Sequence, residues 1–299
     1  MLVGDQIFGC ILGGAIGDCL GGPYEGCPPP VKLVPTRAWR ISDDTQLTLA
    51  TCEAISDHSK VEPGAIASAF SHWFGRNRIV GAGASTYKAL VELNQGGHWA
   101  LVGRRGEMAA GNGAAMRIAP LAFCLDPKDP AARKLIRDVS RITHHSEEAY
   151  AGALAVTLAI RAALDGTWDG EGSLIGLVVQ HLPDTSVRDR LIEIGSLNEK
   201  MPVIDVARRL GSSSYVVDSV PLVLFAVGQI NKVGFVNLLE GIITAGGDTD
   251  TNASIAGQIA GTLLGQTGLP IEMIERIPDL TLITDIAKAF SETVANRPF

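Results

Sequence analysis

The chain has 299 residues, of which 46% are hydrophobic and 19% are charged, a balance that excludes an intrinsically disordered protein. Its formal net charge of −7 at pH 7 disfavours binding to nucleic acid through a broad basic surface. Glycine is abundant, with 34 residues, but it follows no three-residue period, which excludes collagen.

The N-terminal apolar run, from Ile7 to Ile16, predicts a core helix and not a targeting segment. It lies between Asp5 and Asp18, has no basic flank and is too short to span a bilayer. We therefore expect no association with a membrane. The five cysteines are odd in number and include no CxxC pair, which favours a reduced, cytoplasmic chain.

Two predicted helices carry glycine at every fourth position. The stripes are Gly9, Gly13, Gly17 and Gly21 in the first helix, and Gly257, Gly261 and Gly265 in the second. A glycine weakens a helix by about 1 kcal/mol relative to alanine. Close contact between two helices along these bare stripes would offset that cost. We therefore expect the two helices to cross near the centre of the molecule.

The segment Ser42-Asp43-Asp44-Thr45 stands immediately before a helical pattern. Ser42 is a good N-cap, and acids in the first turn of a helix complement its dipole. Capping alone does not explain two adjacent carboxylates, which repel each other unless a cation lies between them. These residues alone leave both interpretations open. Glu25, just beyond the first glycine helix, is by default an exposed acid, but it can also project into the same centre.

Two segments in the middle of the chain have weaker signals. The turn Gly111-Asn112-Gly113-Ala114-Ala115-Met116-Arg117 offers backbone N–H groups that can bind an anion, although Asn-Gly is also a common turn signal. Thr143-His144-His145-Ser146 lies at a predicted helix start. No further His or Cys stands at ligand spacing, so this segment favours local hydrogen bonding over a zinc site.

The segment Gly246-Gly247-Asp248-Thr249-Asp250-Thr251-Asn252 leads into the second glycine helix. Thr251 or Asn252 is a candidate N-cap. Asp-x-Asp after two glycines also predicts a tight turn rich in oxygen atoms. Together with Asp43 and Asp44, this turn supplies four carboxylates, which suit hard cations such as Mg²⁺ or Mn²⁺. The two turns are about 200 residues apart in the sequence, so a shared site requires them to meet in space.

Helical periodicity dominates the rest of the chain, and alternating strand patterns are scarce. Apolar residues at helical spacing predict helices after Pro63, over 135–142, over 150–161 and over 283–294. Pro221 is expected to open a further apolar helix over 222–230, while 177–179 is ambiguous. The predicted fold class is all-α, with a single domain over residues 1–299.

Five segments in this order resemble the ADP-ribosylglycohydrolase family. They are Gly9–Asp18 with Tyr24-Glu25-Gly26, Ser42-Asp43-Asp44-Thr45, Gly111–Arg117, Thr143-His144 and Gly246–Thr251. Each is weak alone, but together they extend over almost the whole chain. The resemblance implies a compact helical domain with two divalent cations, Mg²⁺ or Mn²⁺, in a cleft.

The resemblance also assigns roles to individual residues. It gives the metal ligands as Ser42, Asp43, Asp44, Asp248, Asp250 and Thr251, with Asp250 bridging the two ions. Glu25 matches the mobile acid of the family, and Glu25, Asp43 and Asp44 are the candidate bases. The loop Gly111, Asn112 and Gly113 matches the segment that holds the ADP-ribose phosphates, and His144 matches a histidine near the distal side of the ligand. Serine replaces the family's usual threonine at position 42 but keeps the hydroxyl.

The activity that the resemblance implies is hydrolysis of the bond between ADP-ribose and an acceptor. Arginine on a protein is the expected acceptor; serine, small ADP-ribose esters and nucleic-acid ends are alternatives. The rim of the cleft, Cys27–Arg40 and Asn94–Met108, is expected to choose among them. Prenyl diphosphate chemistry is disfavoured because its DDxxD motif is incomplete at Asp43-Asp44-Thr45-Gln46-Leu47. A non-catalytic relative that only binds ADP-ribose is disfavoured by the intact acids.

Overall fold

The computed structural model describes residues 2–34 and 38–296. Its first half contains α1 (Val3–Gly21), η1 (Gly22–Tyr24), α2 (Asp43–His58), α3 (Pro63–Gly75), α4 (Ala84–Asn94), β1 (Arg104–Arg105), η2 (Glu107–Ala109), η3 (Asn112–Arg117), α5 (Ala119–Cys124), α6 (Pro130–Arg141), β2 (His144–His145) and α7 (Glu147–Asp165). Its second half contains α8 (Leu174–Val179), α9 (Ser186–Gly195), α10 (Val203–Leu210), α11 (Val216–Val227), α12 (Ile230–Thr244), α13 (Thr249–Leu264), η4 (Gln266–Gly268), α14 (Ile271–Ile274) and α15 (Leu280–Ala295). The prediction of an all-α fold is confirmed.

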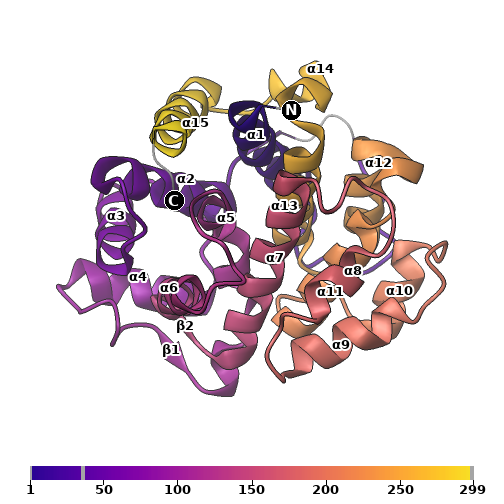
Figure 1. Cartoon of the computed structure of the whole chain (residues 1–299), viewed down its shortest axis with the longest axis horizontal. Helices are drawn as coiled ribbons and strands as arrows, with labels where there is room; N and C mark the ends of the chain where they lie inside the picture. Colours follow the sequence, from indigo (N-terminus) through magenta and orange to yellow (C-terminus); the bar gives the residue numbers. More distant parts are fainter. Residues whose placement is uncertain (1, 35–37, 297–299) are drawn as a thin grey trace.

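The helices form two groups on either side of a central set (Figure 1). Helices α1, α7 and α13 occupy the centre, α2 to α6 lie on one side and α8 to α12 lie on the other. The short strands β1 and β2 pair in parallel, with Arg104 opposite His144. Because α1 and α13 come from opposite ends of the chain, this arrangement brings distant segments to the middle of the molecule.

The glycine stripes of α1 and α13 face each other, as the sequence predicted. A Cβ atom added to Gly13 would lie 2.3 Å from the carbonyl oxygen of Gly257, and one added to Gly257 would lie 2.0 Å from that of Gly13. Gly9 and Gly261 repeat this relation one turn away. The two backbones are therefore in direct contact, which only glycine permits. This contact places the end of α1 beside the start of α13.

The segment Val3–Tyr24 is long and apolar enough to cross a membrane by length and composition, but 72% of its apolar window is buried inside the protein. It is packed against α13 along the glycine stripe. Its hydrophobicity is accounted for by the core of the protein.

Most predicted helices are confirmed, but two local expectations were wrong. Helices α3, α6, α7 and α15 cover the four periodic segments. Helix α11 begins at Val216, so Pro221 lies inside it and does not open it. Proline lacks an N–H group, so this position costs one intrahelical hydrogen bond. The apolar residues on both sides of Pro221 are buried, and their packing holds the helix together.

The other correction concerns a helix start. Helix α13 begins at Thr249 with Asp248 as the N-cap, so Thr251 and Asn252 already lie within its first turn. The prediction of a helix start at 143–146 is confirmed: Ser146 is the N-cap of α7, and its side chain accepts from the Ala149 N–H. His144 and His145, just before it, form β2. The ambiguous segment over 177–179 is the end of helix α8.

Candidate active site

The first acidic turn is a helix start that a buried acid from another helix holds in place. Ser42 is the N-cap of α2, and its hydroxyl donates to Asp44 Oδ2 at 2.9 Å. Asp18, near the end of α1, is fully buried, and its Oδ2 accepts from the Ser42 N–H at 2.9 Å and the Thr45 N–H at 3.2 Å. The turn therefore depends on a tertiary contact as well as on its own capping.

The second acidic turn is fixed by two glycines in the left-handed region. Gly246 has φ 70° and Gly247 has φ 79°. A Cβ atom at Gly247 would also lie 2.3 Å from the Ser212 carbonyl oxygen, so only glycine fits there. The Gly26 N–H donates to the Gly247 carbonyl at 2.8 Å. The loop that carries Glu25 is thereby tied to the turn that carries Asp248.

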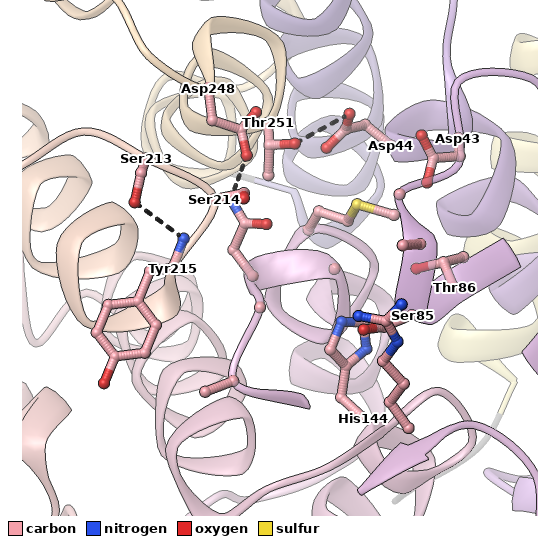
Figure 2. A pocket seen from close by; sticks show the side chains of 18 of the residues that line it. Asp43, Asp44, Ser85, Thr86, His144, Ser213, Ser214, Tyr215, Asp248 and Thr251 are labelled. Atoms are coloured by element: carbon pink, nitrogen blue, oxygen red, sulfur yellow. Dashed lines mark hydrogen bonds between the residues drawn. The ribbon is translucent and has the colours of Figure 1, made fainter. Parts of the chain in front are cut away.

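The two acidic turns meet, as the sequence predicted. Carboxylate oxygens of Asp18, Asp44 and Asp250 all lie within 4.8 Å of one another, and so do those of Glu25, Asp248 and Asp250. Thr251 Oγ1 donates to Asp44 Oδ2 at 3.4 Å, which bridges α13 and α2 directly (Figure 2). Asp250 belongs to both groups of acids, which is the position expected of a residue shared by two sites.

The pKa values of Asp43, Asp44 and Asp250 are raised, so a nearby cation would stabilise their charged forms. Burial, together with the Asp248 charge, raises the pKa of Asp250 to about 9, and burial with the Asp18 charge raises the pKa of Asp43 to about 8. Burial and the Asp250 charge also hold the pKa of Asp44 well above its usual range. Asp18 Oδ1 and Asp44 Oδ1 are buried and have no hydrogen-bond partner among the described residues. Oxygen-only groups with orphaned carboxylate atoms fit a hard divalent cation, so these residues can hold a metal ion.

The glycine-rich loop opens into the same pocket as the acids. The pocket has a volume of about 420 Å³ and is lined by Asp44, Asp248 and Asp250 together with Gly111 to Gly113. This volume is within the range of small-molecule sites. The side chain of Asn112 donates to Asp248 Oδ2 at 2.8 Å, so it fixes the loop to the second acidic turn.

His144 lies at the other end of the pocket from the acids (Figure 2). It is buried against the glycine loop, where a Cβ atom at Gly113 would lie 2.9 Å from its Cε1 atom. Burial, with the Arg117 charge nearby, lowers the pKa of His144 to about 3. The ring is therefore neutral at physiological pH. Tyr215 lies on a third side of the pocket and is 43% exposed.

The structure separates two of the predicted site residues from the rest. Ser42 does not line this pocket but an adjoining one, which shares Glu25 and Asp250 with it. Asp43 lines the main pocket but belongs to neither close group of acids among the described residues. The other predicted site residues line the main pocket together: Glu25, Asp44, Gly111, Asn112, Gly113, His144, Asp248, Asp250 and Thr251.

The expected rim is present in part. Arg104, Glu107 and Met108, from the predicted range 94–108, line the main pocket. Ala38 and Arg40, from the range 27–40, line the adjoining pocket, whereas residues 35–37 lie outside the described part of the chain.

Asp18 is the acid that the sequence analysis passed over. A fully buried aspartate in an otherwise apolar, glycine-rich helix destabilises the fold unless hydrogen bonds or a cation offset its lost hydration. That mismatch between residue and helix face is the signal that would have identified it. Arg117, also fully buried, follows the glycine loop, and no local signal in the sequence marks it.

We expect Asp18→Asn to stabilise the metal-free protein and to reduce the increase in thermal stability that added metal produces. The amide oxygen can keep the bonds to the Ser42 and Thr45 N–H groups, while the amide NH₂ replaces a charge that repels Asp44 and Asp250. The gain is expected to be about 1 kcal/mol without metal. Thermal unfolding with EDTA and with Mn²⁺ measures both effects, and Asp285→Asn, at an exposed position on α15, is the control. A variant with unchanged stability in EDTA and an unchanged Mn²⁺ shift would contradict this expectation.

Comparison with known proteins gives one consistent result. The sequence model of the ADP-ribosylglycohydrolase family matches residues 2–298. The chain is 30% identical to the ADP-ribosylarginine hydrolase Tri1 of Pseudomonas putida (strain GB-1), over 91% of this chain and 74% of that protein. It is 27% identical to the ADP-ribosylhydrolase ARH3 of Homo sapiens, over 88% of this chain and 86% of that protein.

The fold has a counterpart among solved structures. A structure described as an ADP-ribosylglycohydrolase-related protein complex superposes with a TM-score of 0.75 at 23% identity, covering 97% of this chain and 98% of the other. At this identity the likeness establishes the fold.

Proposed function

The chain belongs to the ADP-ribosylglycohydrolase family, and from this premise we propose that it hydrolyses the N-glycosidic bond between ADP-ribose and an arginine side chain of a protein. The observation that carries the proposal is the pocket that joins the two groups of acids to the glycine loop. The acidic end of this pocket is suited to a cation that binds a ribose, and the glycine loop is suited to phosphates. ADP-ribose contains both a terminal ribose and a diphosphate.

The choice of arginine is supported by the relative named for ADP-ribosylarginine hydrolysis, which matches at higher identity than the human relative. The expected partner is an ADP-ribosylated protein or a small ADP-ribose conjugate. Free thiols at all five cysteines, which lie in the described part of the chain, support a cytoplasmic protein. We also propose that residues 1–299 act as a single catalytic domain.

We propose that Asp250 is shared by two divalent cations, Mg²⁺ or Mn²⁺, with Ser42, Asp43, Asp44, Asp248 and Thr251 as the remaining protein ligands. The orphaned carboxylate oxygens of Asp44, in the main pocket, and of Asp18, in the adjoining one, support cations beside Asp250, which lines both. When bound, such ions supply positive charge that orients ribose hydroxyls and acidifies water.

The residues of the chain provide the other parts of the reaction. Backbone N–H groups of Gly111 and Gly113 bind the diphosphate, whereas the Asn112 N–H donates to the Ser214 carbonyl at 3.0 Å. Glu25 lines both the main and the adjoining pocket, so it can accept a proton from an attacking water. The water oxygen bonds to the anomeric carbon of the ribose while the carbon–nitrogen bond breaks, and the released guanidine nitrogen takes up a proton. The carboxylates stabilise the positive charge that develops on the sugar.

A panel of defined substrates tests this proposal. Arginine-linked, serine-linked, ester-linked and nucleic-acid-linked ADP-ribose are each incubated with the protein in Mg²⁺, in Mn²⁺ and in EDTA, and released ADP-ribose is measured. We expect arginine-linked substrate to react at least about tenfold faster than the others, with no release in EDTA and recovery on adding metal. Faster release from another linkage would overturn the choice of arginine. Binding of ADP-ribose without release from any linkage would overturn hydrolysis in favour of a binding protein.

A further inference from the structure

A buried arginine without a carboxylate partner lies behind the glycine loop. Arg117 is fully buried, and none of the ion pairs among the described residues includes it. Its guanidinium donates to the Gly113 carbonyl, to the Val139 carbonyl at 3.3 Å and to Thr143 Oγ1 at 2.9 Å. Burying a cation is costly, and these hydrogen bonds, together with the Phe70 ring 5.1 Å from Cζ, offset part of that cost.

The hydroxyl of Thr143 connects Arg117 to His144. It is fully buried and lies 2.7 Å from His144 Nδ1. An arginine only donates hydrogen bonds, so the hydroxyl accepts from Arg117 and still has one hydrogen to give. Among the described residues, the Nδ1 atom of His144 is the only acceptor within reach of that hydrogen. If Nδ1 carried a proton, the hydroxyl hydrogen would be buried without a partner, which is unfavourable.

The proton of the neutral His144 ring therefore belongs on Nε2. This atom faces the bare backbone of the glycine loop, because a Cβ atom at Gly111 would lie only 3.1 Å from it. No hydrogen bond from Nε2 to another described residue is formed, and His144 lines the pocket. Burial and the neighbouring cations Arg117 and Arg104 hold the pKa of the ring near 3, so it remains neutral.

We propose that Arg117 and Thr143 are positioning residues that hold His144 as an uncharged Nε2–H donor toward an acceptor oxygen of bound ADP-ribose. The proposal rests on the proposed function for the identity of the ligand. The acids lie at the opposite end of the pocket, so this hydrogen bond contributes to binding and hardly to bond cleavage. Loss of the hydrogen bond between Thr143 and His144 should raise KM and the Kd of ADP-ribose and leave kcat almost unchanged.

The tautomer of His144 is measured on the ligand-free protein by long-range ¹H–¹⁵N correlation NMR with ¹⁵N-labelled histidine. The His144 signals are assigned by their absence from His144→Gln. The wild-type protein is expected to show the Nε2–H form, and Thr143→Val is expected to lose this bias. Thr143→Ser, which keeps the hydroxyl, should restore it.

Calorimetric titration with ADP-ribose on the same proteins gives the second readout. Thr143→Val is expected to raise Kd by about five- to tenfold, the effect of one hydrogen bond, and Thr143→Ser should recover wild-type affinity. Thr157→Val is the matched control, because among the described residues this buried hydroxyl bonds only to the Ala153 carbonyl within α7.

An Nδ1–H form in the wild-type protein would overturn the proposal, as would unchanged affinity in Thr143→Val. If wild-type protein shows the Nε2–H form but binds no ADP-ribose, the proposed function fails while the positioning of His144 by Thr143 stands.

Discussion

Asp250→Asn is expected to lower turnover by at least about a thousandfold, which corresponds to about 4 kcal/mol of activation free energy. Asp250 is the one acid that belongs to both close groups of carboxylates among the described residues, so its charge serves both proposed cations. Asparagine has the same shape, and its carbonyl oxygen can still accept from the Thr251 N–H, a bond of 2.9 Å in the native protein. The helical fold should therefore survive the change.

Release of ADP-ribose from the preferred substrate measures this effect, and circular dichroism checks the fold. Asp205→Asn is the matched control, because Asp205 is exposed on α10 and forms an ion pair only with Arg208 among the described residues. The control should keep full activity. Full activity of Asp250→Asn would refute its shared position in the metal site.

Gly257→Ala is expected to cost at least about 3 kcal/mol in the free energy of unfolding. The added Cβ would lie 2.0 Å from the Gly13 carbonyl oxygen and 2.6 Å from its carbon. Both are backbone atoms, so no side chain can rotate away, and the two central helices must separate. Chemical denaturation of the variant and the wild-type protein measures the loss.

Gly241→Ala is the control for this substitution. Gly241 also lies inside a helix, but a Cβ atom there would meet only Val203 Cγ2 at 3.9 Å. This variant should be stabilised by about 0.5–1 kcal/mol, because alanine is the better helix former. If Gly257→Ala were as stable as Gly241→Ala, the two glycine stripes would not be in backbone contact.

The acidic end of the pocket was predictable because its signals are local. Two adjacent acids at the start of α2 and an Asp-x-Asp turn at the start of α13 are visible in the sequence, and the four-residue spacing of glycines predicts the contact that joins them. Only glycine allows such close approach, so the pattern has a single physical interpretation. The order of the motifs then gave the family resemblance.

The partners of the remaining residues were not predictable because they are tertiary contacts. Asp18 acts on Ser42 and Thr45 across 24 and 27 residues, and no local pattern encodes that distance. Arg117 looks like an ordinary charged residue after a turn until the fold buries it. The start of α11 before Pro221 likewise reflects packing that overrides a local helix signal.

Anomalous diffraction from crystals grown in Mn²⁺ locates the cations that the proposed site would hold. We expect two manganese peaks, one among the carboxylates of Asp44 and Asp250 and one beside Asp248 and Asp250. Both peaks should be lost in Asp250→Asn. Manganese bound elsewhere on the chain, or no peak between the two acidic turns, would refute a metal site shared by these turns.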